Sequence, residues 1–291
     1  MLIVFLIVIL IWTTTPLAIQ WSSTSAPLSS VLVRMLIGVM FCLSMMGLIG
    51  MKIPFHTKAR QLYVVGGLTM FLTMSLTYVA AQSIPSGWIS IIFGLSPIAT
   101  GIFSLFFEPE SRLTAIRIFG MCLGIGGLAL VFQAGLAFDS STLPGISLLL
   151  IAMLVASIGS VIMRHLFKDS ELQPMQITTG GLAIAIPFFA LSAFLIEPTV
   201  EINFSQKELL SILYLGLIGT GIGFTLYYYL LKIMSASKVA LLTLITPITS
   251  LLLGNLVNNE PVIKEIWVGA ALVSIGLLLY EHRPKIGLRK I

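Results

Sequence analysis

Charged side chains are scarce in this chain of 291 residues, where Asp, Glu, Lys and Arg together make up 9% of the sequence. A soluble domain carries about 25% of these residues. Because hydrophobic residues make up 57% of the chain, it cannot cover its own surface in water. The composition therefore predicts a protein whose outer solvent is the lipid bilayer.

A nucleic-acid partner is not expected, although the net charge is +5. A nucleic-acid-binding protein gathers its Lys and Arg residues on one face or along one helix. Here the positive residues lie in short loops between apolar runs, which is the distribution of topology signals in membrane proteins.

Motifs for catalysis and for metal binding are also missing from the sequence. It contains no Gly-x-Ser-x-Gly turn, no His-Glu-x-x-His motif and no paired aspartates within the apolar runs. Its two cysteines, Cys42 and Cys122, sit inside apolar runs, where burial as small apolar side chains is favoured over a disulfide. The three histidines lie near run ends and form no cluster with the cysteines. We therefore expect no enzyme activity, no metal site and no cofactor.

Long apolar runs are what the sequence has in abundance. A helix needs about 20 apolar residues to cross the hydrocarbon core of a bilayer. Ten runs are candidates for such spans: Leu2–Ile19, Val31–Gly50, Tyr63–Ala81, Ile84–Phe107, Leu113–Phe132, Leu143–His165, Ile177–Ile196, Leu209–Leu231, Val239–Val257 and Ile263–Tyr280. The connections are short and carry turn residues. The sequence thus predicts an all-α integral membrane protein with ten transmembrane helices.

The distribution of Lys and Arg predicts the orientation of these spans. With a cytoplasmic N-terminus, thirteen of these residues fall on the cytoplasmic side and two, Lys207 and Lys264, on the opposite side. Since cytoplasmic loops are enriched in Lys and Arg, we expect both termini in the cytoplasm, with 282–291 as a short basic tail. The expected location is a bacterial inner (plasma) membrane.

An internal repeat appears when the chain is shifted by 150 residues. The shift superimposes the pairs Gly66/Gly216, Leu76/Leu226, Tyr78/Tyr228, Pro97/Pro247, Glu110/Glu260 and Ile125/Ile275. It lays the third to fifth spans on the eighth to tenth, so each half has five spans. Because five is odd, the second half enters from the opposite side, which makes an inverted repeat. We predict a first five-helix repeat at 1–132 and a second at 143–281.

The pattern resembles the drug/metabolite transporter superfamily in its EamA-type branch. The resemblance rests on four stretches: Trp12 with the following Thr-Thr-Thr-Pro, Arg34-Met-Leu-Ile, Pro97 to Glu110, and Pro247 to Glu260. It implies ten helices in two inverted five-helix repeats around a central cavity, with alternating access. It also implies transport of small molecules such as amino acids or other metabolites.

Arg34 is the strongest single candidate for a binding residue. It lies about one turn inside the second apolar run, where a charge costs several kcal/mol unless it faces a cavity or a partner. One interpretation is a cation that attracts an anionic group of the substrate, such as a carboxylate. The other is a side chain that extends to the external interface.

Aromatic and amide side chains are further candidates for the cavity wall. Tyr78 and Gln82 stand four residues apart and are expected to share a helix face, and Tyr228 is the repeat mate of Tyr78. Trp12 lies deep in the first helix and either lines the cavity or packs against a neighbour. An interfacial aromatic belt is the expected place for another set: Tyr63, Trp88, Tyr227 and Tyr280.

Two prolines lie within spans at matching places of the two repeats. Pro97 and Pro247 are expected to kink their helices and to serve as gate hinges, since proline frees a backbone carbonyl. Hydroxyl residues surround them, and Thr246 is a candidate for substrate binding. Gly120 and Gly124 form a Gly-x-x-x-Gly face that is expected to pack closely against a neighbouring helix.

The carboxylates predict the mode of transport. Glu108, Glu110, Glu260, Glu265 and Glu281 all lie at helix ends, and none lies in the middle of a span. A proton or sodium relay usually needs a carboxylate within the membrane. We therefore expect uniport or exchange.

Together these features predict a transporter for small polar or amphipathic metabolites, amino acids or related compounds, in the direction of export. Its expected partners are the bilayer and a small-molecule substrate, and the sequence does not indicate an oligomeric state. The alternative is a membrane protein that does not transport, either an intramembrane enzyme or an assembly component.

Overall fold

The computed structural model describes residues 2–107, 114–138, 142–198, 204–260 and 262–281. Within these ranges every regular element is a helix, and the helices group into ten segments. Seven segments are single helices: α1 (Leu2–Ser22), α2 (Pro27–Leu48), α3 (Thr57–Ala80), α6 (Ala115–Phe138), α7 (Thr142–Phe167), α8 (Pro174–Ile196) and α13 (Lys264–Glu281). The all-helical prediction is confirmed. The predicted tail at 282–291, together with Glu108 and Glu110, lies outside the described residues.

Three further segments are interrupted. They are α4 (Ser86–Phe93) with α5 (Ser96–Phe107); α9 (Gln206–Tyr214) with the π-helix η1 (Leu215–Ile222) and α10 (Gly223–Ile233); and α11 (Ala236–Ala240) with the 3-10 helix η2 (Leu241–Leu244) and α12 (Thr246–Asn258). Pro97 and Pro247 each occupy the second position of the helix that follows a break. Proline is tolerated there because the first turn of a helix needs no backbone donor.

Among the described residues, seven segments are long and apolar enough to cross a membrane: α1, α2, α3, α4 with α5, α7, α8, and α9 to α10. Ala115–Val131, within α6, is a shorter apolar helix. Large apolar side chains cover much of the outer surface, among them Leu10, Met40, Phe106 and Phe194. Exposure of such an apolar surface to water is unfavourable, whereas the hydrocarbon core of a bilayer accommodates it.

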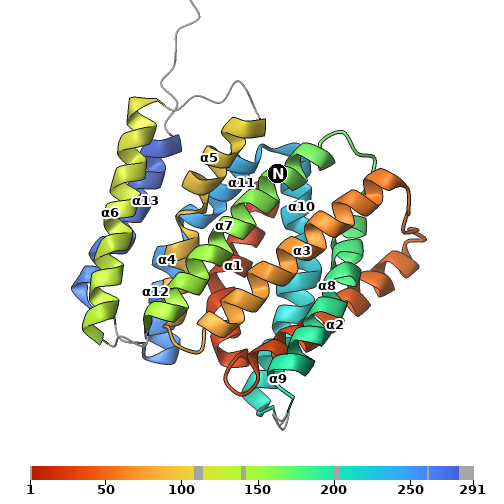
Figure 1. Ribbon diagram of the computed structural model, residues 1–291, viewed down its shortest axis with the longest axis horizontal. Helices are drawn as coiled ribbons and strands as arrows, with labels where there is room; N and C mark the ends of the chain where they lie inside the picture. Colours follow the sequence, from red (N-terminus) through yellow and green to blue (C-terminus); the bar gives the residue numbers. More distant parts are fainter. Residues whose placement is uncertain (1, 108–113, 139–141, 199–203, 261, 282–291) are drawn as a thin grey trace, which may run out of the picture.

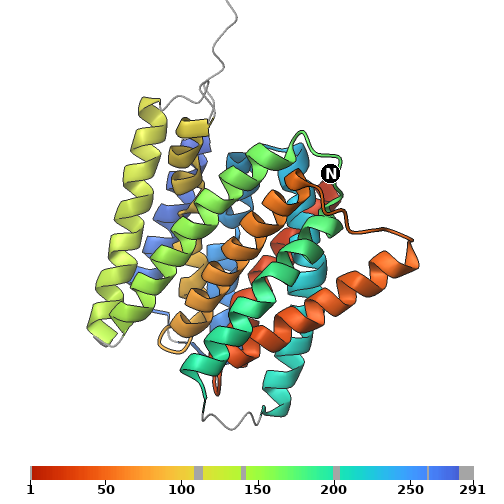
Figure 2. The same cartoon turned by 45° about the vertical axis from the view of Figure 1, so that its right-hand side comes forward.

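The helices form one bundle with a pair of helices at its edge. In both views α6 and α13 run side by side at the left of the bundle (Figures 1 and 2). The helix α3 packs against α7 and α8, while α1 packs against α9 and α12. At the other side of the bundle α2 packs on α8 and η1.

Glycines set the close approach of α6 and α13. A Cβ at Gly127 would lie 2.6 Å from the carbonyl oxygen of Gly269, and Gly120 opposes the backbone of Gly276 in the same way. The expected close packing at the Gly-x-x-x-Gly face is confirmed, because a Cβ at Gly276 would lie 2.5 Å from the carbonyl oxygen of Gly120 and 2.7 Å from the backbone nitrogen of Gly124. Small residues permit such contacts between backbones, which increase dispersion contacts between helices in lipid.

The expected aromatic belt is wrong for the residues that the structure buries. Trp88 is 2% exposed, Tyr63 4% and Tyr280 2%, so these rings pack inside the protein rather than at its boundary. An aromatic ring near a helix end is buried when that helix is surrounded by other helices, and it lies at the membrane interface when the helix is peripheral. The sequence alone does not show which helices are surrounded.

Candidate binding cavity

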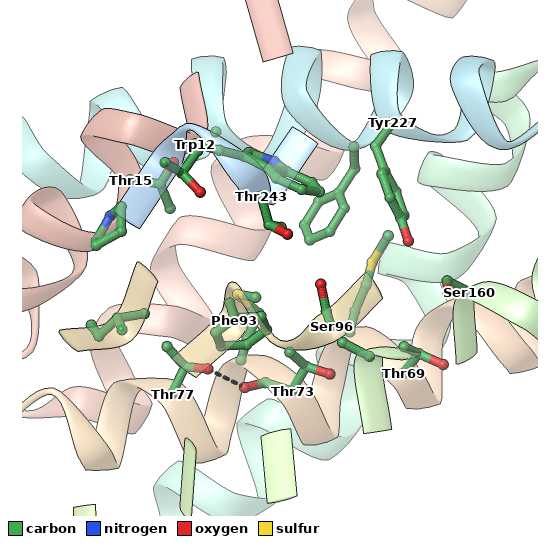
Figure 3. A pocket seen from close by; sticks show the side chains of 18 of the residues that line it. Trp12, Thr15, Thr69, Thr73, Thr77, Phe93, Ser96, Ser160, Tyr227 and Thr243 are labelled. Atoms are coloured by element: carbon green, nitrogen blue, oxygen red, sulfur yellow. Dashed lines mark hydrogen bonds between the residues drawn. The ribbon is translucent and has the colours of Figure 1, made fainter. Parts of the chain in front are cut away.

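A cavity of about 190 Å³ lies between the broken helices and their neighbours. Its wall comes from α1, α3, α4, α5, α7, α10 and α12, with parts of α2, η1, α11 and η2. In Figure 3, Trp12, Tyr227 and Thr243 lie on one side and face Phe93, Ser96 and Thr73 across the space. Segments from distant parts of the chain therefore enclose one site.

Among the described residues of this wall the charged one is Arg34, which is only 2% exposed. Its Nε donates to the Thr220 hydroxyl at 2.9 Å, and its Nη1 donates to the Tyr78 hydroxyl at 3.4 Å. The guanidinium also lies 5.8 Å from the centre of the Tyr78 ring. The described residues thus offer two neutral acceptors to a cation with five donors, so an anionic ligand would complete its coordination.

The approach of η1 to α2 holds Arg34 in place. Gly38 lies one turn beyond Arg34 on α2, and a Cβ there would be 2.5 Å from the Thr220 methyl carbon. Gly216 on the other helix likewise leaves no room, since its Cβ would lie 2.6 Å from a side-chain atom of Ile37. The π-helical turn that carries Thr220 departs from the usual helical register, and such turns are frequent at functional sites.

Hydroxyl groups make up most of the remaining polar wall. Several donate their hydrogens to carbonyls of their own helices, for example Thr15 to Ile11 at 2.7 Å and Thr77 to Thr73 at 2.7 Å. Among the described residues, the Thr73 hydroxyl itself has no partner although the residue is only 4% exposed. A buried polar atom without a partner costs free energy unless something else satisfies it.

Aromatic rings form the apolar wall. The rings of Trp12 and Tyr227 lie 5.5 Å apart, those of Tyr227 and Tyr228 lie 5.6 Å apart, and that of Phe224 lies 6.4 Å from Tyr228. These distances are typical of packed aromatic pairs. The rings make a surface suited to a flat apolar group.

The structure brings four of the predicted binding residues into this wall: Trp12, Arg34, Tyr228 and Thr246. Tyr78 lies behind Arg34 and is fully buried. Gln82 lies outside the cavity, beyond the end of α3, where its exposed side chain donates to the Ser23 carbonyl at 3.3 Å.

Pro97 and Pro247 do not line the cavity, but their neighbours Ser96 and Thr246 do. Each proline therefore lies beside the break in its helix and next to the wall. Their role as hinges remains a prediction.

Sequence reasoning missed Tyr227, Phe224 and the hydroxyls of α7, Ser157 and Ser160, which also line the cavity. Tyr227 was expected in an aromatic belt. Its neighbour Tyr228 carried the repeat signal, and the structure places both rings in the wall, 5.6 Å apart.

Three carboxylates join helices at one end of the bundle, away from the cavity. Glu197 accepts two backbone amides and a hydroxyl at the start of α2, at 2.7–2.9 Å. Glu208 accepts from the amide and the hydroxyl of Ser25, and Glu260 accepts from a backbone amide in the first turn of α4. Carboxylates stabilise helix N-termini in this way, and here each one also links two distant segments.

No group of three or more His, Cys, Asp or Glu side chains that could hold a metal occurs in the described part of the chain. Cys42 is buried and Cys122 exposed, and both are free thiols.

Comparison with known proteins gives consistent matches. The model of the EamA-like transporter family matches residues 1–133 and 143–280. The uncharacterized inner membrane transporter YedA of Escherichia coli K12 is 24% identical over 290 residues, covering 95% of this chain and 91% of that protein. The uncharacterized transporter YvbV of Bacillus subtilis is 24% identical over 225 residues, covering 77% of this chain and 72% of that protein. A solved crystal structure matches with a TM-score of 0.73 and 20% identity over 95% of this chain and 94% of that one. That structure supports the fold alone.

Proposed function

This chain belongs to the EamA-like transporter family and is a multi-pass membrane protein, and we propose that it moves small polar or amphipathic metabolites by alternating access. The proposed substrates are amino acids or related compounds, and the proposed direction is export across an inner membrane with both termini in the cytoplasm. The observation that carries this proposal is the buried Arg34 in a cavity with hydroxyl and aromatic walls.

Helix contacts support the proposed arrangement of two inverted repeats, 1–132 and 143–281. The shift by 150 residues pairs α1 with α7, α2 with α8, α3 with α9–α10, and α6 with α13. The shift also pairs α5 with α12. If each helix is replaced by its mate in the other half, the contact of α3 with α8 corresponds to the contact of η1 with α2. In the same way the contact of α5 with α7 corresponds to the contact of α12 with α1. All of these contacts are present. An inverted repeat suits two mirror-related states that open to opposite sides.

The composition of the wall favours transport over catalysis. The described wall contains serines and threonines but no histidine, lysine or carboxylate that could act as their base. It also holds no carboxylate for a proton or sodium relay, which supports uniport or exchange. A cavity lined by helices from both halves of the chain also favours transport over the rival role of an assembly component.

The test is counterflow in liposomes that contain the purified protein. Vesicles preloaded with unlabelled amino acids and related carboxylates are diluted into the same pool in radiolabelled form, and we expect accumulation of members of this pool that is lost in Arg34→Ala. The matched control is Arg60→Ala, because Arg60 is exposed and outside the cavity wall. Absence of counterflow for amino acids and for a total extract of cell metabolites, with folded protein, would refute transport. Strict dependence on an imposed proton gradient would refute the uniport or exchange mode.

A further inference from the structure

We infer that the cavity selects monoanionic ligands: a carboxylate joined to a flat aromatic body that carries neutral hydrogen-bond donors. It discriminates against the zwitterion and the cation of the same body. This inference rests on the proposed function, since it takes the cavity as the substrate site, and it narrows the proposed substrates from free amino acids to related carboxylates without a free ammonium group.

Charge balance is the first observation behind this inference. The described wall holds one cation, Arg34, and no carboxylate. An α-amino acid would bring an ammonium group close to the carboxylate that Arg34 binds. That ammonium would lose its hydration, meet no anion and feel the repulsion of the guanidinium. A ligand without the ammonium, or with its nitrogen acylated, avoids these costs and still neutralises Arg34.

The placement of the protein's own carboxylates strengthens the first observation. Glu197, Glu208 and Glu260 are bound to backbone amides at one end of the bundle. They are therefore not available to an ammonium group within the cavity.

Hydroxyl polarity is the second observation, and it indicates which neutral groups the ligand carries. Thr15, Thr77 and Ser160 donate their hydrogens to helix carbonyls at 2.7, 2.7 and 2.8 Å. Each oxygen then has lone pairs left for an incoming donor. The Thr73 hydroxyl, without a partner in the described residues, can accept as well. An amide or indole N–H satisfies such oxygens without bringing a charge.

The third observation is the spacing between the cation and the aromatic wall. Thr220, which holds Arg34, precedes Phe224 by four residues and Tyr227 by seven on one continuous helical segment. At about 1.5 Å per residue these rings lie roughly 6 and 10 Å farther along the axis. A carboxylate on Arg34 therefore leaves an aryl group a few bonds away beside Trp12 and Tyr227. The cavity of about 190 Å³ exceeds the roughly 150 Å³ of an apolar cavity known to take up benzene.

The test uses four probes that share an indole ring and differ in charge at pH 7. N-acetyl-L-tryptophan and indole-3-propionate are anions, L-tryptophan is a zwitterion and tryptamine is a cation. Binding to the purified full chain is measured by displacement of radiolabelled N-acetyl-L-tryptophan in a scintillation proximity assay. We expect both anions to bind at least tenfold more tightly than the zwitterion, and tryptamine to bind most weakly.

Variants at the cation test whether Arg34 causes the preference. Arg34→Gln should lose the anion preference, Arg34→Lys should keep part of it, and Arg60→Gln should behave like the wild type. If a variant fails to fold, the order of the four probes on the wild-type protein still decides.

Equal or tighter binding of L-tryptophan or tryptamine would overturn the inference, and so would a lack of anion binding. Neither result refutes the proposed transport, which fails if no metabolite pool undergoes counterflow.

Discussion

A methyl group added at Gly38 perturbs the site without changing any side chain of the cavity wall. The new Cβ would lie 2.5 Å from the Thr220 methyl carbon and 3.0 Å from its Cβ. Ordinary van der Waals contact begins at 3.4 Å, so Thr220 must retreat by about 0.9 Å or change its rotamer. Because Gly38 and Arg34 lie on the same helix, a retreat from one is a retreat from the other.

The hydrogen bond from Arg34 to Thr220 is the expected loss. Its donor–acceptor distance is 2.9 Å, and lengthening this distance by about 0.9 Å would exceed the roughly 3.2 Å limit for a good N–H···O bond. A hydrogen bond to a charged group contributes about 1.5–3 kcal/mol, and the bond of Arg34 to Tyr78 remains. We expect Gly38→Ala to weaken anion binding about tenfold, which corresponds to about 1.4 kcal/mol.

The assay compares dissociation constants and melting temperatures of Gly38→Ala and Gly47→Ala. Gly47 lies on the same helix, and a Cβ there would meet nothing within 4 Å, so this variant should bind like the wild type. Overpacking at Gly38 costs about 1–3 kcal/mol, offset by about 1 kcal/mol of helix propensity, so the protein should still fold. If the two variants bind anions equally well, the proposed role of Thr220 in positioning Arg34 is wrong.

Three further substitutions give separate tests. Gly127→Ala should lower the melting temperature by about 3–6 °C, because its Cβ would lie 2.6 Å from a carbonyl oxygen of α13. The control is Gly126→Ala, which has open space around its Cβ and should not lower the melting temperature. Thr73→Val should leave the melting temperature unchanged or slightly raised, since it removes a buried hydroxyl without a partner, but should slow counterflow; unchanged transport would show that this hydroxyl meets no ligand. Glu197→Ala should destabilise the protein by about 1–2 kcal/mol, seen as earlier thermal unfolding, because it leaves two amides at the start of α2 without their acceptor. The control is Glu171→Ala, because Glu171 is an exposed carboxylate just before α8; equal unfolding of the two variants would contradict the capping role.

Much of the fold was predictable because lipid permits few solutions. A spanning helix satisfies its own backbone groups, so run length alone located the helical segments. Pro97 and Pro247 indicated where two of them are interrupted, and the structure has breaks beside both. The π-helix at 215–222 was not predictable, because it depends on how glycines of this stretch pack against α2.

The candidate site was less predictable, since its geometry depends on where helices end and which way they face. Arg34 could be singled out because a charge within a span requires a partner or a cavity. Gln82 was paired with Tyr78 by helical spacing, but α3 ends at Ala80, so the spacing of a helix no longer applies at residue 82. Thr73 has no special sequence signal, and only the folded structure shows its unmatched hydroxyl.

The charge in the cavity breaks the proposed symmetry of the repeat. The position that matches Arg34 in the second half is Ile184, and the position that matches Thr220 in the first half is Met70. Of the matched tyrosines, Tyr78 supports the guanidinium, whereas Tyr228 packs with other rings of the apolar wall. A symmetric scaffold supports two mirror-related states of similar energy, but a single cation gives the ligand the same orientation relative to the protein in both. The ligand's anionic end would then stay bound to one half while access changes from one side of the membrane to the other.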